Sequence, residues 1–297
     1  MTAAGPGGLA GRVVLVTGGG KGLGRAFALD AAARGARVVV NNRNRVVDDA
    51  GRGPADHVVR EIEAAGGEAV ADHGAVEDPA TADRLVATAL ERWGRLDGLV
   101  TSAAISRPQI FHRTSPENLQ EVLAVNVVGT ALVAAAASRV MRGAGYGRIV
   151  LVASTAGLHG EPTVSAYAAS KGAVIALGRT AAVEGARRGV RTNVVLPYAT
   201  TQMTSEGMDP RYAGLMRAEA VAPLVSALLD PGSEINGQVI VAAAGGIRVA
   251  DSVEGGTVRF DGTTDLAAAI AASRGGKQHT YPEAQAAFQD FAAELIP

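Results

Sequence analysis

The sequence contains no cysteine, and its formal net charge is −1 over 297 residues. The lack of cysteine excludes disulfides and thiolate chemistry. The lack of a basic excess argues against a nucleic-acid partner, because surfaces that bind nucleic acid carry clustered lysine and arginine. The five histidines are scattered and do not show the spacing of a metal site. We therefore expect neither nucleic-acid binding nor a bound metal.

Aromatic residues and long apolar runs are also scarce. Aromatics make up 4% of the chain and hydrophobic residues 47%, so alanine, valine and leucine must build most of the core. No run of about 18 apolar residues suggests a membrane span. The first residues, MTAAGPGGLAG, lack the basic and then apolar segments of a secretory signal. We expect a cytoplasmic protein without a membrane partner.

A glycine-rich turn, GGGKGLG, stands between a β-branched run at 12–17 and a helical pattern at 23–34. Such a run is typical of a buried parallel strand. Glycine permits positive φ and the close approach of a phosphate, and the start of a helix offers free N–H groups. A plain turn is the alternative, but the strand–turn–helix order favours dinucleotide binding. The candidate residues are Gly18, Lys21, Gly22, Leu23 and Gly24.

The second strand, expected at 36–41, leads into Asn42, Arg43, Asn44 and Arg45. The end of this strand normally faces the adenosine ribose, where an acidic residue selects NAD. No carboxylate is present here, and the guanidinium of Arg43 would attract a 2′-phosphate. We therefore expect NADP(H) as the more suitable cofactor, with NAD(H) as a possibility. A solvated basic loop is the alternative interpretation.

Strand and helix patterns continue to alternate along the chain. Strands are expected at 68–71, 96–101, 148–153, 191–196 and 238–242, and helices at 55–65, 79–93, 116–141 and 164–187. With no hairpin signals among them, the alternation predicts a doubly wound parallel sheet, a Rossmann-like α/β fold. We expect one catalytic domain over 1–245. Residues 246–297, with a hairpin at 246–260 and helices at 263–272 and 282–294, are expected to pack on it as an extension.

Three side chains predict a proton-transfer site. Tyr167 and Lys171 are four residues apart, so they share one face of a helix. An ammonium beside a phenol favours the phenolate and lowers its pKa toward the working range. Ser154 follows the apolar strand at 148–153, where α/β sheets present side chains to a ligand. Together these residues indicate the interconversion of a carbonyl and an alcohol.

Other residues carry weaker predictions. Ser102 and Ala103 follow the strand at 96–101 and are expected beside the nicotinamide ribose. Asn126, inside a helical pattern, is either structural or the holder of a water in a proton relay. The loop at 197–217 is expected to cover the substrate. Small residues on the helix at 164–187 suggest a homodimer or homotetramer, although close packing within one chain explains them equally well.

The run TGGGKGLG at 17–24, Asn126, Ser154 and Tyr167-x3-Lys171 together resemble the short-chain dehydrogenase/reductase family over about residues 10–250. Within it, the chain is most similar to the (3R)-hydroxyacyl-CoA dehydrogenase part of the peroxisomal multifunctional enzyme type 2. The stretches on which this resemblance rests include EIEAAGGEAVA, EAVAPLVSALL and the tail with YPEAQAAFQDF. The resemblance implies a ketone or alcohol as substrate and a nicotinamide cofactor.

The resemblance also implies roles for single residues. Tyr167 would be the general acid and base, and Lys171 would lower its pKa and bind the nicotinamide ribose. Ser154 would hydrogen-bond the substrate oxygen, and Asn126 would anchor a water. Further cofactor contacts implied are Val76, Tyr167, Ala199, Thr200 and Thr201.

Departures from the family pattern lie at the adenosine end of the cofactor. Ala104 replaces a glycine, Asn42 replaces the ribose-binding aspartate, and Gly74 replaces an aspartate beside the adenine. They lead us to expect a ketoreductase that uses NADPH. The alternatives are a (3R)-3-hydroxyacyl-CoA or hydroxysteroid dehydrogenase that uses NAD and, from another class, a non-catalytic dinucleotide-binding sensor.

Overall fold

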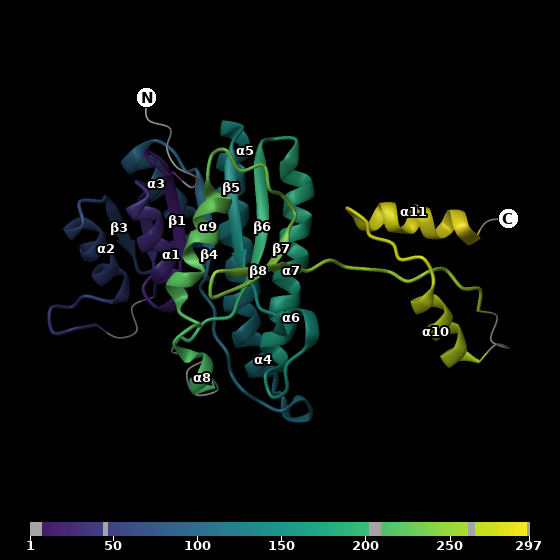
Figure 1. The fold of residues 1–297 in the computed structure, drawn as a ribbon. Helices are drawn as coiled ribbons and strands as arrows, with labels where there is room; N and C mark the ends of the chain where they lie inside the picture. Colours follow the sequence, from purple (N-terminus) through teal and green to yellow (C-terminus); the bar gives the residue numbers. More distant parts are fainter. Residues whose placement is uncertain (1–7, 44–46, 202–208, 261–264, 296–297) are drawn as a thin grey trace. The chain divides into compact units, whose positions relative to one another are not determined.

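An eight-stranded sheet forms the centre of the catalytic part of the chain (Figure 1). The computed structural model describes residues 8–43, 47–201, 209–260 and 265–295. The strand order is β3-β2-β1-β4-β5-β6-β7-β8, and each neighbouring pair from β3 to β7 runs parallel. The strands are β1 (Val13–Thr17), β2 (Arg37–Asn41), β3 (Ala69–Asp72), β4 (Gly98–Thr101), β5 (Gly147–Val152), β6 (Val190–Pro197), β7 (Val239–Ala243) and β8 (Gly246–Val249).

Helices cover both faces of this sheet (Figure 1). On one face α1 contacts α2 and α9, and on the other α5 contacts α3 and α7. Every residue of β1 and β5 is buried, as strands covered on both faces require. The predicted doubly wound, Rossmann-like fold is therefore confirmed. The helices named here are α1 (Gly22–Ala33), α2 (Pro54–Ala64), α3 (Pro79–Trp93), α5 (Thr130–Ala144), α7 (Ser165–Ala186) and α9 (Ala222–Leu229).

The prediction of a single α-helix at 116–141 is wrong in the middle of that range. The structure has α4 (Pro116–Leu123), a π-helical segment (Ala124–Gly129) and then α5. A π-helical segment widens the turn, and such segments are frequent at functional sites. Asn126 lies within this one and is fully buried. The apolar periodicity of the sequence does not reveal the widened turn, because the helix continues on both sides of it.

The run Pro116–Ala144 is also long and apolar enough to cross a membrane, contrary to the expectation that the chain has no such run. Half of its most apolar window is buried inside the protein. Val133, Ala137 and Met141 are fully buried in α5, which contacts α3, β4 and β5. This packing is what a core helix of an α/β sheet requires, and it accounts for the apolar composition.

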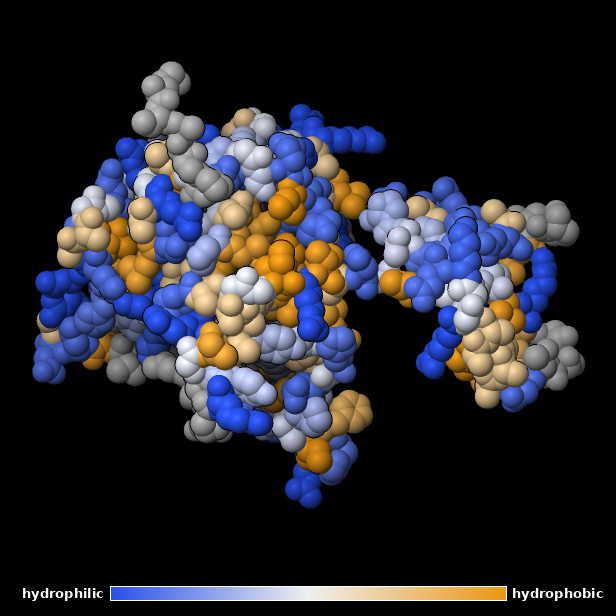
Figure 2. Space-filling view, viewed as in Figure 1, coloured by the Kyte–Doolittle hydropathy of each residue, from blue (hydrophilic) through white to orange (hydrophobic). Residues whose placement is uncertain are grey.

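A hairpin that the sequence did not signal forms the edge of the sheet. Only Ala244 and Gly245 separate β7 from β8, and both have positive φ, 48° and 81°. Two such residues make the tight turn that joins antiparallel strands, although alanine is unusual there. The expected hairpin at 246–260 is therefore displaced toward the N-terminus. Figure 2 shows apolar side chains gathered over β7 and β8, where Ile247 is 61% exposed.

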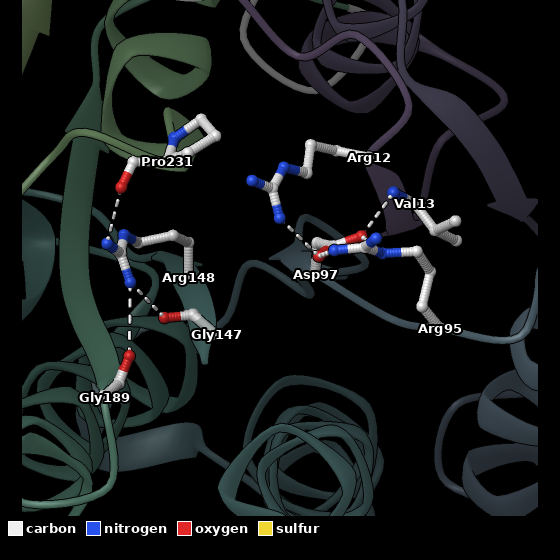
Figure 3. Close-up of polar contacts among 8 residues, drawn as sticks. All are labelled: Arg12, Val13, Arg95, Asp97, Gly147, Arg148, Gly189 and Pro231. Carbon is white, nitrogen blue, oxygen red and sulfur yellow. Dashed lines mark hydrogen bonds and ion pairs between the residues drawn. The ribbon is translucent and has the colours of Figure 1, made fainter. Parts of the chain in front are cut away.

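The amino ends of the strands, opposite the candidate site, are held by buried charge (Figure 3). Asp97 accepts hydrogen bonds from Arg12 and Arg95 and from the Val13 N–H. Burial opposes ionisation of Asp97, but these hydrogen bonds outweigh it and lower the pKa of the carboxyl. The guanidinium of Arg148 donates to the carbonyls of Gly147, Gly189 and Pro231. These contacts fix the end of the sheet at which no chemistry is expected.

The chain divides into two compact units, Met1–Arg248 and Val249–Pro297, close to the boundary expected after 245. The second unit contains α10 (Leu266–Gly275) and α11 (Ala284–Leu295). Its helix α11 is tied by Asp290, which accepts from the Tyr281 hydroxyl and lies 3.0 Å from His279 Nδ1. The predicted packing of this extension on the catalytic domain stays a prediction. The expected helix at 263–272 starts outside the described residues.

His279, Asp290 and Glu294 bring their ligand atoms within 4.8 Å of one another. The histidine spacing of the sequence gave no sign of this cluster. The contact between Tyr281 and Asp290 and that between His279 and Asp290 already explain the arrangement as a hydrogen-bond network. We therefore do not infer a metal site from this cluster.

Candidate active site

One cavity of about 960 Å³ opens at the carboxyl ends of the parallel strands. Residues that directly follow β1, β2, β4, β5 and β6 line it, as expected for a ligand site in a doubly wound sheet. Two predicted residues, Asn126 and Thr200, do not line this cavity, whereas the other candidates do. Those that line it are Gly18, Lys21, Gly22, Leu23, Gly24, Asn42, Arg43, Val76, Ser102, Ala103, Ser154, Tyr167, Lys171, Ala199 and Thr201.

The glycine turn forms the cradle of this cavity. Gly18 has φ +63°, and a Cβ there would stand 2.6 Å from the Ala103 nitrogen. A Cβ on Gly24 would overlap the Gly18 carbonyl oxygen, so both positions require glycine for packing. Helix α1 begins at Gly22, and its N-cap residue Lys21 makes no side-chain cap, which leaves the first N–H groups to a ligand. These residues fit a pyrophosphate group.

Gly20 is a cradle residue that the sequence analysis did not select. A Cβ at this position would lie 2.6 Å from Pro54 Cβ and 2.9 Å from Asn42 Cγ. The turn is therefore closed on its outer side by the start of α2 and by the side chain after β2. No short motif could have shown this, because Pro54 follows 34 residues later.

The ribose end of the cavity differs from the prediction in one respect. Arg43 lines the cavity, but its guanidinium Nη1 is 2.8 Å from Glu77 Oε1. The end of β2 carries no carboxylate of its own, as expected, but the turn after β3 supplies one. Asn41 is buried and donates to Asp72 and to the Gly74 carbonyl. Asn44 and Arg45, and residues 202–208 of the loop expected to cover the substrate, lie outside the described residues.

Ser154, Tyr167 and Lys171 come together at the other end of the same cavity. Ser154 follows β5, and the other two stand one turn apart on α7. The Lys171 Nζ atom is 5.5 Å from the centroid of the Tyr167 ring and donates to the Val152 carbonyl at 3.0 Å. The Ser154 hydroxyl makes a hydrogen bond that stabilises the ionised form of the Tyr167 phenol. The phenol and the serine hydroxyl can therefore act on one substrate atom, with the ammonium near the phenol ring.

The pKa of Tyr167 corrects the prediction from spacing. Burial raises the pKa of this phenol above 10.0, and the hydrogen bond from Ser154 lowers it only in part. Lys171 is not among the causes of the shift, and its own pKa is lowered by burial from 10.5 to about 8. Desolvation of both groups outweighs their mutual effect. The spacing of the two residues could not reveal how deeply each is buried.

Asn126 acts as a clamp between the catalytic helix and the loop after β4. Its Oδ1 accepts from the Ile105 N–H at 2.8 Å, and its Nδ2 donates to the Ile105 carbonyl and to Ser170 Oγ, each at 2.9 Å. Ser170 Oγ in turn donates to the Tyr167 carbonyl at 2.7 Å. The structural interpretation of Asn126 thus has direct support, while the water relay stays a prediction. Ile105 and Ser170 carry no signal in the sequence.

Comparison with known proteins identifies the class. A family profile described as short chain dehydrogenase matches residues 12–211. A short-chain type dehydrogenase/reductase of Mycobacterium tuberculosis is 38% identical over 239 residues, which cover 80% of this chain and 84% of the relative. The chain therefore belongs to the short-chain dehydrogenase/reductase family, and it is an oxidoreductase that binds a nicotinamide dinucleotide and acts on small molecules.

A second relative carries the name of the predicted subgroup, and one solved structure covers most of the chain. The peroxisomal multifunctional enzyme type 2 of Drosophila melanogaster is 40% identical over 237 residues, which cover 79% of this chain. This chain spans only 39% of that enzyme's length. A crystal structure of a short chain dehydrogenase from Mycobacterium avium matches with a TM-score of 0.79 at 37% identity and covers 93% of this chain and 98% of that one. The predicted resemblance to the multifunctional enzyme is confirmed.

Proposed function

We propose that this protein is a ketoreductase that reduces a small ketone to a secondary alcohol with NADPH. The observation that carries the proposal is that Ser154, Tyr167 and Lys171 line the same cavity as the glycine cradle. The cradle residues would hold the pyrophosphate of a dinucleotide, and residues that follow the other strands in the same cavity would hold the rest of it. When bound, the nicotinamide would supply the hydride.

Side chains of the protein supply the proton for this reduction. Tyr167 keeps its proton at neutral pH because burial raises the pKa of the phenol. It can therefore donate that proton to the carbonyl oxygen as negative charge develops there. The Ser154 hydroxyl, which donates to the phenol, would turn its one O–H toward the same oxygen when substrate binds. The charge that appears during reduction thus meets two donors, and the alcohol leaves with the tyrosine proton.

Lys171 supports this chemistry as a buried cation. Its ammonium lies in the cavity wall at neutral pH and would stabilise the phenolate that remains once Tyr167 has given up its proton. A proton taken up from solvent would then restore the phenol. The pKa of about 8 means that this charge is lost at moderately alkaline pH. A tyrosine with a raised pKa and a lysine that is charged only below about pH 8 favour reduction over oxidation near neutrality.

Arg43 supports NADPH as the cofactor. It lines the cavity at the end of β2, where no acidic side chain of the second strand stands to repel a 2′-phosphate. NAD-dependent oxidation of a (3R)-3-hydroxyacyl-CoA or of a hydroxysteroid is the second candidate. Two observations favour it: Glu77 beside Arg43, and the 40% identity to a peroxisomal multifunctional enzyme.

The replacement Tyr167→Phe tests the proposal against the non-catalytic sensor. Reduction of a ketone panel that includes a 3-oxoacyl-CoA, a steroid ketone and a simple keto ester should fall by at least about 1000-fold, because the proton donor is removed. NADPH binding should change by less than about threefold, because the cradle is intact. Equal turnover by the variant would contradict the mechanism, and no turnover by the wild type on any ketone would favour the sensor.

Tyr146→Phe is the matched control, because it removes the same hydroxyl at the opposite end of the sheet. The Tyr146 hydroxyl is buried without a hydrogen-bond partner among the described residues. Its loss should leave turnover unchanged. A panel in which only the 3-oxoacyl-CoA is reduced, with NADH preferred at least about tenfold, would replace the ketoreductase proposal with the second candidate.

A further inference from the structure

Two opposite charges stand together at the ribose end of the cavity. Arg43 follows β2 and Glu77 follows β3, and the two side chains form an ion pair with a distance of 2.8 Å between Nη1 and Oε1. They are 31% and 26% exposed, so the pair is only partly screened by solvent. Both residues line the cavity. Among the described cavity residues the other carboxylate is Glu161, which precedes the catalytic helix α7.

The two cofactors differ only at the 2′-position of the adenosine ribose. NADP(H) carries a phosphate with a charge of about −1.5 to −2 at pH 7, and NAD(H) carries a hydroxyl. A guanidinium attracts the phosphate, whereas a carboxylate repels it and can accept a hydrogen bond from the hydroxyl. Because Arg43 and Glu77 are in direct contact, a group that reaches Arg43 also meets the charge of Glu77.

We propose that Glu77 is a specificity-determining residue that limits the preference for NADP(H) and allows the protein to bind both cofactors. This inference rests on the proposed function, in which the cavity holds a nicotinamide dinucleotide. Arg43 would face a 2′-phosphate, and Glu77 would offset part of its charge and favour a 2′-hydroxyl. An ion pair that only ordered the two loops would affect the binding of both nucleotides alike, which makes the two explanations separable.

The test measures binding and requires no substrate. Dissociation constants of NADPH and NADH are determined for the full chain by fluorescence titration at one low ionic strength. Adenosine 2′,5′-bisphosphate and 5′-AMP are titrated as probes of the ribose end alone. In Glu77→Gln the ratio of the two dissociation constants should shift toward NADPH by about tenfold, because one negative charge is removed beside the phosphate. The two probes should show the same shift.

Four further variants test the direction of the shift and its dependence on charge. Arg43→Gln should shift the ratio toward NADH by about tenfold or more, because the phosphate loses its cation. Glu77→Asp keeps the charge and should leave the ratio near that of the wild type. Glu91→Gln removes an equal charge from the exposed face of α3 and should change neither constant. Glu77→Ser serves as a second charge-removing variant should Glu77→Gln not fold.

The outcomes separate the inference from the proposed function. A wild type that binds neither nucleotide would overturn both. A wild type that binds both, with a ratio that Glu77→Gln and Glu77→Ser leave within about twofold, would overturn only the inference. A shift of the ratio toward NADH on removal of the carboxylate would likewise overturn only the inference. A shift of the ratio toward NADPH, matched by the same shift in the ratio for the two adenosine probes, supports the inference.

Discussion

Replacing the buried Lys171 by methionine should remove activity and yet stabilise the protein. Burial lowers the pKa of this lysine from 10.5 to about 8, so the folded state disfavours its charged form. That change corresponds to about 3 kcal/mol of unfavourable charge burial at neutral pH. Methionine has a similar length and carries no charge. The Val152 carbonyl would lose its donor, which offsets about 1–3 kcal/mol of the gain.

The pH dependence of the difference is the sharper readout, because the lost hydrogen bond contributes equally at every pH. Below about pH 8 both folded and unfolded chains bind the lysine proton, and the full penalty applies. Between about 8 and 10.5 only the unfolded chain keeps it, so the wild type gains stability as the pH rises. The advantage of Lys171→Met should therefore fall by about 2 kcal/mol between pH 7 and 9.5.

Urea unfolding of the protein without nucleotide, at pH 7, 8.5 and 9.5, measures this difference. Lys277→Met is the matched control, because it removes an exposed lysine of the second unit and should show no such trend. A stability difference between Lys171→Met and wild type that stays constant from pH 7 to 9.5 would refute the reasoning. It would mean that the folded lysine keeps an ordinary pKa.

Three other predictions address the site, the sheet and the assembly. Ketone reduction should decline above about pH 8 as the Lys171 ammonium is lost, and Lys171→Arg, if active, should move that decline to higher pH in a rate profile. Asp97→Asn should cost about 3 kcal/mol in urea unfolding at pH 7, because Arg12 and Arg95 lose their anion. The cost should shrink as the pH falls below 3.8, where the unfolded chain binds the Asp97 proton while the lowered pKa keeps the folded carboxyl ionised. Ala176→Arg, on an exposed small-residue position of α7, should convert a homodimer or homotetramer into a smaller species by light scattering, and an unchanged mass would exclude this face as the interface.

The parts of the fold that follow from local pattern could be predicted from the sequence. The strand runs at 12–17 and 148–153 match β1 and β5 within one residue at each end, because buried parallel strands are short and continuously apolar. The glycine cradle could also be predicted, because the strand–turn–helix order is a local pattern. The hairpin at Ala244 and Gly245 escaped prediction, since its turn lacks the Asn-Gly or Asp-Gly signal.

Features that depend on contact across the fold could not be predicted. The ion pair between Arg43 and Glu77 joins residues 34 positions apart, through the pairing of β2 with β3. The pKa of Tyr167 depends on burial, which helical spacing does not report. Spacing therefore identified which side chains share the site but not the direction in which the site shifts their pKa values.

The most direct test of the account is a crystal structure with NADPH and an unreactive alcohol or ketone analogue bound. The account predicts a pyrophosphate on the cradle at Gly18–Gly24 and the ligand oxygen within hydrogen-bond distance of both Ser154 Oγ and the Tyr167 hydroxyl. It also predicts the ammonium of Lys171 beside the nicotinamide ribose. A bound dinucleotide that leaves the Tyr167 hydroxyl out of reach of the ligand oxygen would contradict it.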